Sequence, residues 1–249
     1  MKVTFAGVVR SEWTKLVSLP SNVLLLTGVP VLFAALSAVI GANSHGPADP
    51  TLAVGGGFLL YALAVGILGM VMVTGEYQSG LMRSTLTAVP RRVPVLLAKA
   101  GVLLGAVGPV MVAAYFGAFL ANQAFTDSAA RISLGDPGIV AALLGAAGAT
   151  IGAGLLGLAL GTLLRSTPGS IATYVVTLLV LPPSLLAAVP AAAQDRVLPF
   201  VPTIALQGMF QVGERSPGMF SPGGSALVVL AWVILMLAGA AVVLQRRDI

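Results

Sequence analysis

The stretch GEYQSGLMRSTLTAVPRRVPVLLAK, residues 75–99, separates two long apolar runs and holds one of the chain's few acids, Glu76. Thr74 is of a type that caps helix starts, and Glu76 would then lie in a first turn, where a carboxylate favours the helix dipole. Pro90 lacks a backbone donor and would end that helix. The basic residues of the stretch are Arg83, Arg91, Arg92 and Lys99. We therefore expect a short basic helix over 75–90, outside the bilayer, in a position to contact another protein.

The composition around this stretch is that of an integral membrane protein. Apolar residues make up 57% of the 249 residues, charged residues only 8%, and the mean hydropathy is +1.01, which excludes an ordinary water-soluble domain. The chain has no cysteine, so disulfides, thiolate chemistry and cysteine metal sites are excluded. The net charge of +5 comes from basic residues beside apolar runs, which indicates membrane orientation better than nucleic-acid binding.

Six apolar runs are long enough to cross the membrane, because about 20 helical residues span the hydrocarbon core. The expected spans are 21–42, 51–73, 94–121, 138–164, 170–189 and 223–244. Pro109 predicts a kink in the third span and the pair Pro182-Pro183 an interruption of the fifth. The predicted fold is one all-α integral membrane domain over residues 1–249, with six transmembrane helices.

Residues 2–17 predict an amphipathic helix lying along the membrane surface, because its apolar side chains recur at helical spacing on one face. Trp13 belongs to this apolar face and Lys15 to its flank. Glu12 is the exception, since it falls within the apolar stripe. Either Glu12 reaches water or pairs with Lys15, or it meets a basic residue of the 75–99 stretch.

The positive-inside rule sets the expected orientation. With both termini in the cytoplasm, ten basic residues fall inside and three outside. The inside set is Lys2, Arg10, Lys15, Arg83, Arg91, Arg92, Lys99, Arg165, Arg246 and Arg247, and the outside set is Arg131, Arg196 and Arg215. The long segment 190–222 would lie at the outer face as one or two short helices, one of them beginning at Pro202. We expect a multi-pass plasma-membrane protein with both termini cytoplasmic.

The sequence contains no pattern of an enzyme. No span carries an ionisable residue in its central portion, which argues against an ion-coupled carrier or an intramembrane protease. The single histidine, His45, is expected to be inert, and there is no GxxxxGK[ST] sequence for binding ATP. We therefore expect no catalytic residue, cofactor or metal in this chain.

Glycine pairs and uncharged polar residues occur at span depth. Gly101 and Gly105, Gly148 and Gly152, and Gly157 and Gly161 are spaced for close helix packing, either within the bundle or at a subunit interface. Four polar residues are candidates for a substrate path: Tyr61, Tyr115, Tyr174 and Thr177. The alternative is that these side chains only pack the bundle or bond to their own helix backbones.

The stretch after the second span resembles the permease subunits of ATP-binding-cassette exporters of the second type, in an actinobacterial-looking branch. These carry Glu-x-x-x-Gly, a hydrophobic stretch, a proline and a later lysine, which match Glu76, Gly80, Pro90 and Lys99. The opening RSEWTKL (10–16) and the closing RRDI (246–249) are similar too. The resemblance covers the whole chain in layout.

The resemblance implies an elbow helix over 2–17, carrying Glu12, Trp13 and Lys15, and a coupling helix over 75–90 that contacts a separate nucleotide-binding subunit. The implied coupling residues are Glu76, Tyr77, Gly80, Arg83, Pro90, Arg91 and Arg92. Two permease copies, identical or related, would pair with two ATPases, and ATP and magnesium would bind to those partners. The implied cargo is an amphiphilic or hydrophobic drug, antibiotic, lipid or peptide. A stand-alone secondary carrier and a structural membrane anchor are the alternatives.

Overall fold

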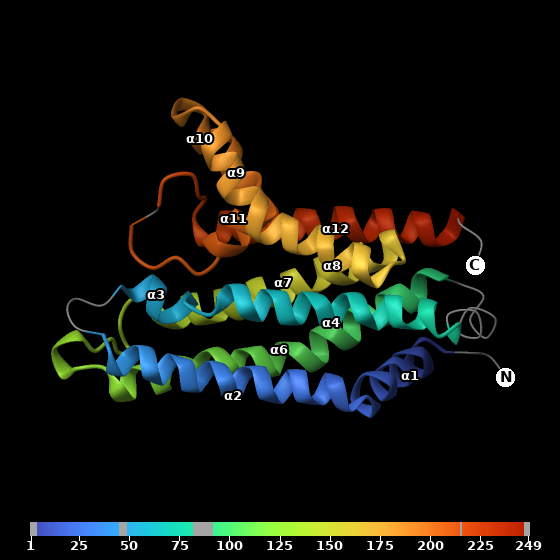
Figure 1. Cartoon of the computed structure of the whole chain (residues 1–249), viewed down its shortest axis with the longest axis horizontal. Coiled ribbons are helices and arrows are strands. Elements are labelled where there is room, and N and C mark those ends of the chain that lie inside the picture. Colours follow the sequence, from blue (N-terminus) through green and yellow to red (C-terminus); the bar gives the residue numbers. More distant parts are fainter. Residues whose placement is uncertain (1–3, 45–48, 82–91, 215, 247–249) are drawn as a thin grey trace.

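The computed structural model describes residues 4–44, 49–81, 92–214 and 216–246, and within these ranges every regular element is helical (Figure 1). Six helical stretches are long and apolar enough to cross a membrane. They are α2 (Pro20–Ala42), α3 with α4 (Pro50–Gln78), α6 (Arg92–Phe125), α7 (Ile139–Leu164), α8 to α9 (Thr167–Ala188) and α12 (Pro222–Arg246). The all-α architecture with six apolar helices is confirmed, and the expected bounds shift by a few residues.

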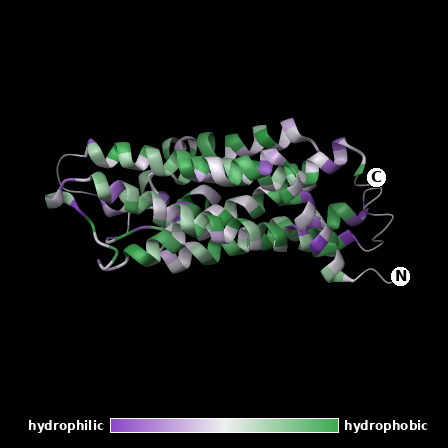
Figure 2. Ribbon diagram, turned by 90° about the horizontal axis from the view of Figure 1, so that it is seen from below, coloured by the Kyte–Doolittle hydropathy of each residue, from purple (hydrophilic) through white to green (hydrophobic). Residues whose placement is uncertain are grey.

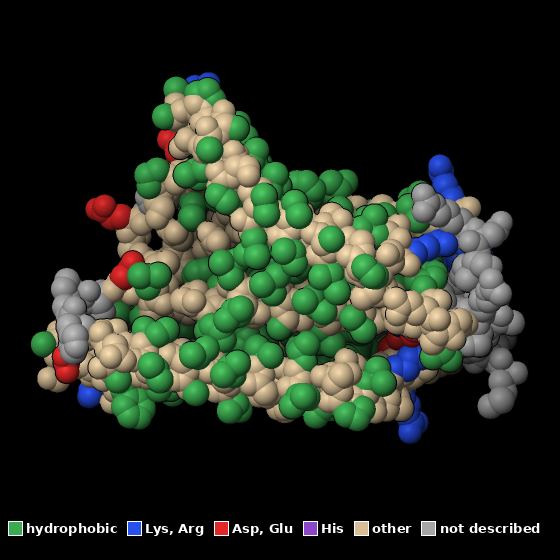
Figure 3. All heavy atoms as spheres, in the orientation of Figure 1, with side chains coloured by type: hydrophobic (Ala, Val, Ile, Leu, Met, Phe, Trp, Pro, Cys, Tyr) green, Lys and Arg blue, Asp and Glu red, His purple; other side chains and the backbone are tan. Residues whose placement is uncertain are grey.

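The two ends of the bundle differ in charge. The described N- and C-terminal segments reach the same end, here called the terminal end, and the opposite end is called the loop end (Figure 1). Lys and Arg side chains gather at the terminal end, and most visible Asp and Glu side chains lie at the loop end (Figure 3). Hydrophilic residues concentrate near both ends, whereas the middle of the bundle is mainly hydrophobic (Figure 2).

Helix α7 is the centre of the bundle and contacts α4, α6 and α12. Its glycines permit a close approach to α4, because a Cβ at Gly157 would collide with the backbone of Gly66, and one at Gly161 would meet the backbone of Met70 at 3.0 Å. The close packing expected at Gly157 and Gly161 is confirmed. Gly101 and Gly105 are different, since a Cβ added at either residue would have no described atom of another segment within 4 Å.

The second span consists of two helices, α3 (Pro50–Gly55) and α4 (Phe58–Gln78), with a break at Gly56 and Gly57. The glycines at this break make room for aromatic rings. A Cβ at Gly55 would collide with the ring of Phe210, and one at Gly57 with the ring of Phe33. The break therefore lets Phe33 of α2 and Phe210, which follows α11, lie against the backbone.

The fifth span changes its helical winding where the sequence predicts an interruption. α8 (Thr167–Val175) continues into a π-helical turn, Val176–Val180, and then into α9 (Leu181–Ala188). Pro182 and Pro183 have no backbone N–H for the preceding turn, and a widened turn accommodates that loss. The two prolines thus alter the helix without ending it.

The segment before the last span contains α10 (Ala191–Val197), a 3₁₀ turn (Leu198–Phe200) and α11 (Pro202–Gly208). The predicted helix start at Pro202 is confirmed. The indole nitrogen of Trp232, on α12, donates to the carbonyl of Phe200 at 2.9 Å. Helices α9 and α10 project away from the bundle (Figure 1).

Candidate functional site

The N-terminal helix α1 (Phe5–Ser18) starts at a capped residue, since the hydroxyl of Thr4 accepts a hydrogen bond from the Gly7 amide at 3.3 Å. Its predicted apolar stripe is divided between two environments. Val8, Glu12 and Leu16, spaced four residues apart, are buried against the bundle. Phe5, Trp13 and Val17 are exposed apolar side chains. The helix therefore presents one face to the protein, with a carboxylate at its centre, and another outward.

The structure corrects the expected helix start at Thr74. Helix α4 continues through Thr74 and Glu76 to Gln78, and Gly80 follows with a φ of +73°. A left-handed glycine just after a helix is a common terminator. The hydroxyl of Thr74 accepts a hydrogen bond from Thr167 at 2.7 Å and caps nothing. Glu76 consequently lies in the last turn, where the dipole opposes a carboxylate, so another interaction must stabilise it.

Two lysines supply that interaction. Nζ of Lys99 lies 2.7 Å from Oε1 of Glu76 and 2.6 Å from Oε2 of Glu12. Nζ of Lys15 lies 2.7 Å from Oε1 of Glu12 and 2.8 Å from Oε1 of Glu76. Lys99 also donates to the carbonyl of Met72 at 2.9 Å. The four side chains form one network, here called the ion network, which joins α1 to the ends of α4 and α6.

The ion network is balanced in charge and mostly buried. Two carboxylates face two ammonium groups, and the side chains of Glu12 and Lys99 are each only 2% exposed. Isolated charges at such positions would be strongly unfavourable, so each member depends on the others. Lys15, at 33% exposure, is the member open to solvent. Burial lowers the pKa of Lys15, but hydrogen bonds to Glu12 and Glu76 and their charges outweigh it and hold that pKa above its ordinary value.

Glu12 pairs with Lys15 and also with Lys99 of the 75–99 stretch, so both predicted ion pairs are present, whereas the alternative that Glu12 reaches water is wrong because its side chain is buried. The central role of Lys99 was missed. The available signal was a lysine just inside an apolar span, where a charge requires a partner. The Oε2 atom of Glu76 is buried and has no hydrogen-bond partner among the described residues.

The other predicted coupling residues are distributed around the ion network. The guanidinium of Arg165 lies 5.1 Å from the centre of the Tyr77 ring. Arg92 donates to the carbonyl of Leu244 at 2.7 Å, so this side chain contacts the last turn of α12. Arg83, Pro90 and Arg91, and most of the predicted 75–90 helix, lie outside the described residues.

The four candidate path residues line two separate cavities. Tyr61 and Tyr115 line a cavity of about 410 Å³ at the loop end. Tyr174 and Thr177 line a more apolar cavity of about 530 Å³ between the fifth span, α11 and α12. The hydroxyl of Tyr174 donates to the carbonyl of Ala62 at 2.8 Å, and that of Thr177 to the carbonyl of Thr173 at 2.8 Å. The bonding of Thr177 to its own helix, which was the alternative to a path, is thus observed.

A scan against protein-family models gives no match to this chain, and a search of the curated proteins gives no significant match. Within the described residues, no group of three or more His, Asp or Glu side chains is placed to hold a metal ion. By the length and composition of its six apolar helices, the chain is a multi-pass helical membrane protein. In the part of the chain that the structure describes, the ion network joins four charged side chains from three helices.

Proposed function

We propose that this chain is the membrane-spanning subunit of an ATP-binding-cassette exporter, driven by a separate nucleotide-binding subunit. The observation that carries the proposal is the ion network. Residues 82–91 connect α4 to α6, and Glu76 and Lys99 lie one on each side of that connection. A force applied to 82–91 by a partner would act on helices joined to each other and to α1 by charged contacts.

The distribution of charge supports an external energy source. The ionisable residues of the apolar helices lie at their terminal ends, as with Glu76 and Lys99, and not at mid-span. Proton- and ion-coupled carriers normally use ionisable groups within the membrane. A transporter without them needs its energy from elsewhere, which favours the exporter over a stand-alone carrier.

The exposure of two spans supports a second permease copy. Of the 18 most apolar consecutive residues of α2, only 6% are buried inside the chain. The same share is 11% for the fifth span and 61% for α7. Both spans therefore depend on lipid or another protein to cover them. A homodimer or a related heterodimer, with two ATPases, follows from the proposal.

Purification of the tagged chain from its native membrane tests the proposal directly. We expect a protein with a GxxxxGK[ST] sequence and ATPase activity to co-purify. Recovery of the chain alone, after mild solubilisation and cross-linking, would contradict an exporter and favour the carrier or the anchor.

The orientation is tested with single cysteines in the cysteine-free chain. Ser128, at the loop end, and Ser79, at the terminal end, are both exposed. With both termini cytoplasmic, an impermeant thiol reagent should label S128C in intact cells and leave S79C unlabelled. Labelling of S79C but not of S128C would place both termini outside the cell.

The coupling role of the ion network is tested in the assembled complex by Glu76→Gln. We expect substrate-stimulated ATPase activity to fall several-fold, because the amide cannot balance the charges of Lys15 and Lys99. The matched control is Asp136→Asn, which removes one negative charge at the loop end, where the exposed Asp136 accepts a hydrogen bond from the amide of Ser133. Wild-type coupling in Glu76→Gln would reduce Glu76 to a structural residue.

A further inference from the structure

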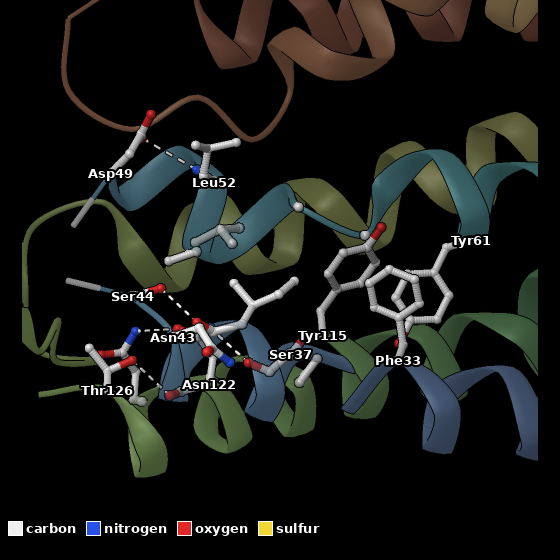
Figure 4. A pocket seen from close by; sticks show the side chains of 17 residues that line it. Phe33, Ser37, Asn43, Ser44, Asp49, Leu52, Tyr61, Tyr115, Asn122 and Thr126 are labelled. Atoms are coloured by element: carbon white, nitrogen blue, oxygen red, sulfur yellow. Dashed lines mark hydrogen bonds between the residues drawn. The ribbon is translucent and has the colours of Figure 1, made fainter. Parts of the chain in front are cut away.

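The cavity of about 410 Å³ at the loop end opens at a mouth and is lined by residues of this one chain (Figure 4). It lies between α2, the short helix α3, the start of α4 and the end of α6. Its volume is in the range of small-molecule sites. Its lining residues come from 33–44, 49–61 and 115–126, so the tertiary fold brings the end of α6 against the first two stretches to form the cavity.

The inner part of the cavity is aromatic. The ring centres of Phe33 and Tyr61 are 4.5 Å apart, and those of Tyr61 and Tyr115 are 5.0 Å apart. All three side chains are buried and line the cavity. The hydroxyl of Tyr115 bonds to Thr150 at 2.8 Å, whereas that of Tyr61 is buried with no hydrogen-bond partner among the described residues. This part is suited to an apolar or aromatic body.

The outer part of the cavity is polar, and none of the described residues that line it is basic. Its uncharged polar lining residues are Ser37, Asn43, Ser44, Asn122, Gln123 and Thr126. Among the described lining residues Asp49 alone is charged, and it lies at the outer edge beside Leu52 (Figure 4). Oδ1 of Asp49 accepts from the amides of Thr51 and Leu52, at 2.8 and 3.3 Å.

The surrounding charge has the same sign as Asp49. Apart from Asp49 itself, the connections at the loop end, 43–49, 126–138 and 189–221, carry three basic and four acidic residues, which gives 3 − 4 = −1. A negative field at a cavity mouth attracts cations and repels anions. A cationic group held at this mouth also remains near solvent, so it avoids the large desolvation cost of a buried charge.

We propose that this cavity is a binding site for a cationic amphiphile. The apolar or aromatic body lies against Phe33, Tyr61 and Tyr115, and the ammonium-type head lies at the mouth, near Asp49 and the side-chain amides. The site goes beyond the exporter proposal, because one chain forms it and binding requires neither an ATPase nor a second copy.

The test measures binding to the purified full chain in nanodiscs of neutral lipid, with empty nanodiscs subtracted. The probes are phenylbutylammonium, phenylbutanol and phenylpentanoate, which share an aromatic body and differ in head charge. We expect the cation to bind most tightly and the anion least, with at least a ten-fold difference between them. Equal binding of all three, or tighter binding of the anion, would overturn the proposal.

Three variants locate the site. Asp49→Asn should weaken binding of the cation several-fold and leave the alcohol unchanged, because asparagine still caps the start of α3. Ala53→Phe, which places a ring in the cavity wall, should weaken all probes. Asp136→Asn is the matched control, since Asp136 is outside the cavity lining, and should bind as the wild type does.

The result is independent of the exporter proposal. If Asp49→Asn and Ala53→Phe both bind the cation as the wild type does, the cavity is not the site and the proposal fails, whatever co-purifies. If Asp136→Asn weakens binding as much as Asp49→Asn, only the general field acts, and the proposed site also fails. Size-exclusion profiles and thermal unfolding check that each variant is folded. If Ala53→Phe is not folded, Asp49→Asn alone decides the outcome.

Discussion

The two ends of this bundle differ in how their polar side chains are arranged. At the terminal end, Glu12 and Lys99 are almost fully buried and neutralise each other at 2.6 Å. At the loop end, uncharged amides and hydroxyls surround an open cavity, and Asp49, the charged residue among its described lining, is exposed. The comparison shows that buried charges here join helices to one another, whereas uncharged polar groups line a cavity.

The largest expected effect is at the terminal end, from Lys99→Met. This change leaves Glu12 and Glu76 buried and close together with one partly exposed lysine, Lys15, to compensate them. Breaking a buried pair costs about 3–5 kcal/mol of unfolding free energy. The thermal midpoint of the purified chain should fall accordingly. The control Lys15→Met should cost about 1 kcal/mol or less, because Lys15 is partly solvated; equal losses in both variants would show that burial does not rank the two lysines.

A rescue experiment separates charge balance from individual contacts. Adding Glu12→Gln to Lys99→Met removes one charge of each sign, so Lys15 and Glu76 remain as a pair 2.8 Å apart. Replacing buried ion pairs by neutral groups is often tolerated, so the double variant should regain most of the stability lost in Lys99→Met. Additive losses in the double variant would mean that geometry, not net charge, holds α1 in place.

At the loop end, the matching test is Gly57→Ala. The added Cβ would collide with the ring of Phe33 and displace the aromatic part of the cavity. Forced repacking of this kind costs about 1–3 kcal/mol. Gly105→Ala is the control, since nothing outside its helix lies within 4 Å of the built Cβ, and a helical Gly→Ala change there should be neutral or slightly stabilising. A wild-type thermal midpoint for Gly57→Ala would show that the break between α3 and α4 adjusts freely.

Hydroxyl deletions compare the loop end with the bundle core. Tyr174→Phe removes a hydroxyl that donates to the carbonyls of Ala62 and Ala153, at 2.8 and 3.2 Å, and should cost about 1 kcal/mol. Tyr61→Phe removes a buried hydroxyl with no partner among the described residues and should cost nothing or slightly stabilise the chain. A marked loss in Tyr61→Phe would point to a bound molecule or water at that hydroxyl.

The smallest effect is a pH dependence of the ion network. Because the pKa of Lys15 is raised in the folded chain, its contribution is fully present below the ordinary lysine pKa of about 10.4. That contribution is lost as the pH rises through the raised value. The thermal midpoint should therefore decline above about pH 10.4 and decline less in Lys15→Met. A decline of the same size in the variant would assign the effect to other groups.

Much of the secondary structure was predictable from composition and spacing. Six apolar runs predict six helices because each backbone polar group must be satisfied within the segment in lipid. Pro202 marked the start of α11, and the period of four at Val8, Glu12 and Leu16 placed a carboxylate on the inner face of α1. The expected cap at Thr74 was wrong, because helix propensity alone does not show that the helix continues to Gln78 and ends before Gly80.

What the sequence by itself determined is the class of protein: an all-helical chain with six apolar helices and most of its basic residues near one set of helix ends. These properties depend on local periodicity and on the cost of unpaired polar groups in lipid. Only the tertiary structure decided which side chains contact one another. Lys99 meets Glu12 across 87 positions of sequence, and Phe33, Tyr61 and Tyr115 meet around one cavity. Long-range contacts of this kind depend on how helices pack and on which side chains share a buried volume, and neither is encoded in the spacing of any single segment.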